Sequence, residues 1–77
     1  MPLKQQLVDE IEVLLRYSLE TKHEGLKVHN DARQELRDAT RRLFEKGLIN
    51  QKDGGYLTDL GHDAAKHTEA LLSLLRA

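Results

Sequence analysis

Apolar residues recur every three or four positions along the first twenty residues, which is the spacing of one face of an α-helix. This face comprises Leu3, Leu7, Ile11, Leu14 and Ser18, flanked by Val8, Leu15 and Leu19. The opposite, solvated face is expected to carry Lys4, Asp9, Glu10, Glu12, Arg16 and Glu20. The pattern therefore predicts an amphipathic helix that frays between residues 20 and 24 and stops at Gly25.

A second helix is predicted to begin at Asp31 and to end at Lys46. Before it, residues 26–29 alternate apolar and polar side chains and fit either a short strand or an extended connector. Asn30 and Asp31 are good N-cap residues, and Gln34 stands three positions after Asp31, as in a capping box. Gly47 suits a left-handed C-cap. The buried stripe is expected to comprise Ala32, Leu36, Ala39, Leu43 and Phe44.

A small hairpin and a last helix are predicted after the second helix. Residues 48–52 and 56–58 flank Asp53-Gly54-Gly55, and Asp-Gly favours a type I′ turn because both central positions of that turn need positive φ. Thr58 is placed to cap the last helix, whose apolar face comprises Leu60, Ala64, Ala65, Thr68, Leu71, Leu72 and Leu75. The end of this helix is apolar almost all round, which predicts a homodimer interface formed by Leu71, Leu72, Leu74 and Leu75.

The order helix, short strand, helix, hairpin, helix predicts a mostly helical α+β fold around one core. A chain of 77 residues supports a single domain, residues 1–77. A domain this small buries only roughly 60% of the surface of its unfolded chain, which also favours a dimer. The sequence has no cysteine, which excludes disulfides and thiolate chemistry. Its first residues lack the apolar core of a signal peptide, and no stretch approaches ~20 apolar residues, so we expect a cytoplasmic protein without a membrane partner.

Positive charge is concentrated in the middle of the chain, although the net charge is −1. Residues 25–52 carry seven Lys and Arg against four Asp and Glu, whereas acidic residues outnumber basic ones on both sides. Arg33, Arg37 and Arg41 recur every four residues, so they drift only about 40° per step and form one row along the second helix. Gln34 and Thr40 border this row, and the helix acids fall on the far side.

These side-chain types suit duplex DNA, because Arg pairs with phosphate and guanine, Gln with adenine, and Thr with phosphate or a thymine methyl group. The predicted contacts are Arg33, Gln34, Arg37, Thr40 and Arg41, with peripheral charge from Lys27, Arg42 and Lys52. The same charges also fit an ordinary solvated helix face with weak local pairs, such as Asp38 with Arg41 or Arg42.

Enzyme chemistry finds no support in the sequence, and we expect no cofactor and no metal ion. His62 and His67 are five positions apart, about 140° around a helix, and His23 and His29 lie in connectors. The serines are not in an elbow-like context, and Gly54-Gly55 is a turn and not a phosphate loop.

Two stretches, residues 39–49 and 55–61, resemble the second half of a winged-helix DNA-binding domain of the MarR and PadR kind. The pattern Leu-x-x-x-Gly-Leu-Ile, which ends the recognition helix in those families, is filled by Leu43, Gly47, Leu48 and Ile49. The pattern Leu-Thr-x-x-Gly, which opens the helix after the wing, is filled by Leu57, Thr58 and Gly61. The chain is also similar in length and layout to short, uncharacterised bacterial proteins to which DNA binding has been ascribed.

The resemblance implies a winged helix with the hairpin as its wing, and a role in transcription regulation. The chain departs from the family pattern where only residues 28–30 separate the expected strand from the second helix, so the helix-turn-helix is incomplete or compressed. Lys52 is the only basic residue of the wing. The first hypothesis is a DNA-binding homodimer; the alternative is a protein interaction module, an adaptor or anti-regulator, on the same scaffold without nucleic-acid contact.

Overall fold

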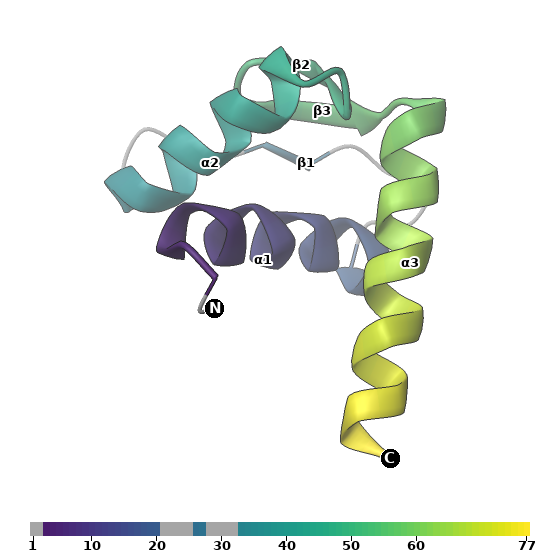
Figure 1. Ribbon diagram of the computed structural model, residues 1–77. Helices are drawn as coiled ribbons and strands as arrows, with labels where there is room; N and C mark the ends of the chain where they lie inside the picture. Colours follow the sequence, from purple (N-terminus) through teal and green to yellow (C-terminus); the bar gives the residue numbers. More distant parts are fainter. Residues whose placement is uncertain (1–2, 21–25, 28–32) are drawn as a thin grey trace.

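The computed structural model describes residues 3–20, 26–27 and 33–77. These residues form three helices and a three-stranded antiparallel sheet (Figure 1). The elements are α1 (Gln5–Glu20), β1 (Leu26–Lys27), α2 (Gln34–Glu45), β2 (Ile49–Gln51), β3 (Gly54–Leu57) and α3 (Asp59–Arg76). The expected mostly helical α+β architecture is therefore confirmed, and α2 and the hairpin lie on the same side of α1.

The buried face of α1 differs from the predicted one. Val13, Leu14 and Tyr17 are buried, whereas Leu3 and Leu7 are 64% and 42% exposed. Val13, Leu14 and Tyr17 form one row at helical spacing, which shares Leu14 with the predicted face. Helices α2 and α3 both pack against α1. Tertiary packing, and not the leucine pattern, therefore selects the face that is buried.

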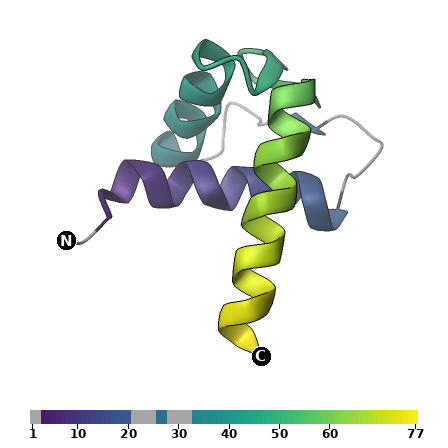
Figure 2. The ribbon, with the colours of Figure 1, turned by 45° about the vertical axis from the view of Figure 1, so that its right-hand side comes forward.

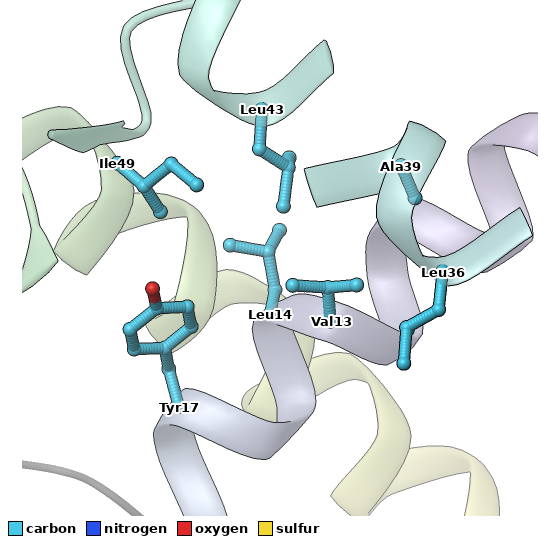
Figure 3. Packing of buried hydrophobic residues seen from close by; sticks show 7 residues of the cluster. All are labelled: Val13, Leu14, Tyr17, Leu36, Ala39, Leu43 and Ile49. Carbon is cyan, nitrogen blue, oxygen red and sulfur yellow. The ribbon is translucent and has the colours of Figure 1, made fainter. Parts of the chain in front are cut away.

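The core lies between α1 and the unit formed by α2 and the hairpin (Figure 3). Its buried members are Val13, Leu14, Tyr17, Leu36, Ala39, Leu43 and Ile49. Tyr17 also donates a hydrogen bond from its hydroxyl to the carbonyl of Gly55, 3.0 Å away, which ties α1 to β3. Burial, with a smaller contribution from the charge of Asp53, raises the pKa of Tyr17 to about 12.

Helix α2 begins later than predicted, at Gln34, with Arg33 in the N-cap position and no side-chain cap. Gln34 donates to Asp38. Its predicted capping partner Asp31 lies outside the described residues, as do Asn30, Ala32, and Val28 and His29 of the expected strand. The predicted stripe is confirmed at Leu36, Ala39 and Leu43, and Phe44 is half-buried.

The end of α2 is a Schellman motif, as the glycine predicted. Gly47 has a φ of 82° and donates its N–H to Phe44, while Leu48 donates to the carbonyl of Leu43, 2.9 Å away. The motif satisfies two carbonyls at the helix end and turns the chain into β2.

The sheet has the strand order β1-β3-β2. Gln51 pairs with Gly54, so the two turn residues are Lys52 and Asp53, one position before the predicted pair. Neither has positive φ, which excludes the predicted type I′ turn. The register between β2 and β3 shifts by one residue, as in a β-bulge. Gly54 and Gly55 of β3 have φ of 134° and 77°, so the positive φ values occur in the strand and not in the turn.

Thr58 caps α3 as predicted: its hydroxyl accepts from Gly61 N–H and donates to the carbonyl of Gly47. The backbone N–H of Thr58 donates to Leu48, so the chain after β3 is fastened to the chain after α2. Gly61 lies so close that an added Cβ would meet the carbonyl of Leu48.

The second half of α3 projects past α1 in both views (Figures 1 and 2). Leu71, Leu74 and Leu75 are 57%, 76% and 70% exposed there. Leu72 differs from them because it is half-buried and shares a hollow with Leu15 of α1. Leu60 of the predicted apolar face is exposed, whereas Ala65 is buried.

Candidate nucleic-acid interface

Two arginines of the predicted row, Arg37 and Arg41, lie on α2, whereas Arg33 is the N-cap residue before it, with a non-helical ψ of 143°. Arg33 and Arg41 are exposed, and Arg37 is half-buried, one turn before Thr40 of the buried stripe. Among the described residues, no salt bridge joins Arg33, Arg37 or Arg41 to a carboxylate. The local ion pair of Asp38 with Arg41 or Arg42, which an ordinary solvated helix face could form, is thus not formed.

Arg37 is held along the helix by Gln34. Its Nη2 donates to Gln34 Oε1 at 2.6 Å, and Gln34 Nε2 donates to Asp38 Oδ1 at 2.7 Å. The Nε of Arg37 is buried and has no hydrogen-bond partner among the residues described. A buried donor without a partner costs about 1–3 kcal/mol, so Arg37 is not in its most favourable environment.

Thr40 does not belong to the exposed row, contrary to the prediction. It is fully buried, and its hydroxyl donates to the carbonyl of Leu36 at 2.8 Å. Thr40 follows Leu36 by one helical turn and therefore shares the core face of α2 with Ala39 and Leu43. A contact between this hydroxyl and DNA is excluded in this conformation.

Arg42 and Lys46 hold a buried carboxylate of α1. Arg42 Nε donates to Glu10 Oε2 at 3.1 Å, Lys46 Nζ binds Glu10 Oε1, and Arg42 Nη2 donates to the Gln6 carbonyl at 3.2 Å. The Glu10 side chain is only 8% exposed, so its predicted place on the solvated face is wrong. The partners are 32 and 36 positions away in the chain, and no local pattern could reveal them. Arg42 thus bridges two helices, and its charge is compensated.

A polar hollow of about 170 Å³ lies between α2 and the hairpin turn. Arg37 and Arg41 line it from α2, and Lys52 lines it from the turn. The remaining lining consists of Gln34, Asp38, Asp53 and buried Thr40. The fold therefore brings together three basic residues that the sequence placed in two separate elements. Arg33 lies outside the hollow, and the side chain of Lys27 lies outside the described residues.

The described ranges contain no group of three or more His, Cys, Asp or Glu residues placed to hold a metal ion. His62 and His67 are exposed on α3. Over the same ranges, the helices are all too short or too polar to cross a bilayer.

Comparison with known proteins identifies one family, described as a family of unknown function (DUF5669), which matches residues 1–76. The chain belongs to this family. The match spans all of the described elements, from α1 to α3. No curated protein and no solved structure matches the chain. The DUF5669 description assigns no activity to the family.

Proposed function

We propose that the protein binds double-stranded DNA through the outer face of α2 and the hairpin turn. The observation that carries the proposal is the row of Arg33, Arg37 and Arg41, whose guanidinium groups form no salt bridge within the described residues. Guanidinium groups bind phosphate and guanine in a forked geometry, and an α-helix fits the major groove of DNA. Lys52 adds a positive charge from the turn beside this row.

A winged-helix arrangement is the scaffold that we propose for this role, with α2 as the recognition helix and β2–β3 as the wing. Support comes from the positions that carry the sequence resemblance, which meet in space. Thr58 bonds to Gly47 and Leu48, and Gly61 packs on Leu48. Six residues separate β1 from α2, too few for a complete additional helix, so the helix-turn-helix is proposed to be compressed.

We also propose that two copies associate through the projecting half of α3. Its exposed leucines form an apolar surface that is costly to leave in water. A two-fold dimer presents two copies of α2, which predicts a palindromic site and a role in transcription regulation.

The decisive experiment measures binding to a random-sequence duplex by fluorescence anisotropy over a salt series. R37A/R41A is expected to weaken binding about tenfold or more at low salt and to flatten the salt slope by about 2, since each phosphate contact contributes roughly 0.9. The matched control is K4A/K66A, which removes the same charge from exposed positions outside α2 and the hairpin turn. Both variants should keep the melting temperature. Equal losses in the two variants would refute the assigned face.

A protein interaction module remains the second candidate function, because a specific feature favours it. Leu3 and Leu7 line a largely apolar groove of about 410 Å³ between α1 and α2, in addition to the leucine surface of α3. Retention of the wild-type chain on heparin separates the two functions. A phosphate-binding face is retained at about 50 mM salt and eluted by more salt, whereas passage without retention supports the interaction module.

A further inference from the structure

The hollow lies between α2 and the hairpin turn. At the other end of the hairpin, the Schellman motif after α2 and the hydrogen bonds of Thr58 hold the hairpin to α2. Arg37 and Arg41 stand one helical turn apart on α2, and Lys52 approaches them from the turn. The hollow's volume of about 170 Å³ is large enough for a phosphate group.

The charges in the hollow select an anion. Three cations oppose two acids, Asp38 and Asp53, so the lining carries one net positive charge. Asp38 is already hydrogen-bonded to Gln34, whereas Arg41 and Lys52 have no hydrogen-bond or ion-pair partner within the described residues. The hollow thus offers unused N–H donors from two directions.

Arg37 adds a further unused donor. Its Nη2 is occupied by Gln34, but its Nε is buried without a partner. An acceptor that pairs with this N–H would relieve the cost of leaving the donor unpaired.

We propose that this hollow binds one phosphate group, held by Arg37 and Arg41 from α2 and by Lys52 from the turn. A tetrahedral phosphate has oxygens pointing in several directions and so accepts from both elements at once. The phosphate belongs either to the DNA backbone, in which case the inference rests on the proposed function, or to a free phosphate ion. In both cases the bound group fastens the hairpin turn to α2.

Asp53 sets the strength of this site. Its carboxylate lines the same hollow and repels a phosphate, so it acts against the three basic residues. Removing this charge with D53N should tighten phosphate binding, and removing the opposite charge with K52A should weaken it. The two changes are adjacent in one exposed turn and have opposite expected signs, so loss of folding cannot imitate both.

The first arm of the test uses inorganic phosphate and the free protein. Phosphate is titrated into the ¹⁵N-labelled chain at constant ionic strength, and the Nε–H signals of Arg37 and Arg41 and the amides of the turn are followed by NMR. We expect saturable shifts at these positions, with about threefold weaker binding in K52A and about threefold tighter binding in D53N. The control K66A should bind phosphate like the wild type. An absence of saturable shifts, or the same direction of change in K52A and D53N, would overturn the proposal.

The second arm uses duplex DNA and the same variants. If the phosphate comes from DNA, K52A reduces the salt slope by about 1 and D53N raises the affinity. If the chain binds phosphate with these signs but does not bind DNA, the phosphate site stands and the proposed function fails. If DNA binds but K52A and D53N both behave like K66A, the proposed function stands and the phosphate site fails.

Discussion

The carbonyl oxygen of Leu48 lies 1.9 Å from the point that a Cβ on Gly61 would occupy. Helix α3 therefore begins in direct contact with the chain that leaves α2, and only glycine permits this approach. The same junction carries the hydrogen bonds from Thr58 to Gly47 and Leu48. The relative placement of α2, the hairpin and α3 depends on this contact.

Gly61→Ala is expected to destabilise the protein by about 3 kcal/mol, because the backbone at Leu48 must move to admit a methyl group. Gly47→Ala is the comparison: its Cβ meets nothing within 4 Å, and its cost of about 1 kcal/mol comes from the positive φ alone. Urea denaturation measures both. A smaller loss for Gly61 than for Gly47 would contradict the close approach.

Glu10→Gln is expected to lower the free energy of unfolding by about 2 kcal/mol, because Arg42 and Lys46 lose the charge that compensates them. The value stays below that of a fully buried pair because the Lys46 side chain is half exposed. Glu12→Gln, at an exposed position of α1, removes the same charge and should change stability by less than about 0.5 kcal/mol. Similar values for the two variants would show that Glu10 does not bridge the helices.

Tyr17 makes stability sensitive to alkaline pH. Its pKa is about 12 in the folded protein and about 10 in the unfolded chain, so the unfolded state loses this proton first. The stability that this group contributes is complete below pH 10 and is lost as the pH rises toward 12. Tyr17→Phe should therefore show a smaller decrease across this window, measured by urea denaturation at several pH values.

At neutral pH the same Tyr17→Phe variant should be less stable by about 1 kcal/mol, because it lacks the hydrogen bond to Gly55. Parallel curves for the two proteins between pH 10 and 12 would show that the hydroxyl is not buried as described.

The leucines of α3 provide a test of self-association. Multi-angle light scattering should give twice the mass of one chain for the wild type and a single-chain mass for L74Q/L75Q. Leu60→Gln is the control, because Leu60 is similarly exposed but lies in the first turn of α3, at the end that does not project. A wild-type monomer at high concentration would remove the proposed interface.

Local chemistry explains which parts of the structure could be predicted from the sequence. Gly47 and Thr58 mark the end of α2 and the start of α3, because a left-handed C-cap and a hydroxyl N-cap act within a few residues of themselves. The placement of Arg37 and Arg41 one turn apart was predictable because it needs only helical periodicity, whereas Arg33 lies before the helix. The Asp-Gly pair predicted the wrong turn residues. Gly54 belongs to β3, where it pairs with Gln51, so the turn consists of Lys52 and Asp53.

The features that the sequence did not reveal depend on contacts between distant elements. Glu10 looks like a surface carboxylate until Arg42 and Lys46 are brought to it, and Thr40 looks like a polar surface residue until the fold buries it. Val13 became a core residue because α2 and α3 select the buried face of α1. The hollow beside Lys52 also needs two elements, so no single helix or turn contains its signature.

The strand order has a consequence for behaviour at high concentration. β3 is paired on both sides, and the strands that remain open on one side, β1 and β2, are two and three residues long, with an irregular register beside β2. Such short edge strands with an irregular register are poor templates for pairing with a strand from another molecule, which limits fibril-like growth of the sheet. Crowded solutions of this protein should accordingly suffer from clustering of leucine-rich helices and not from cross-β aggregation.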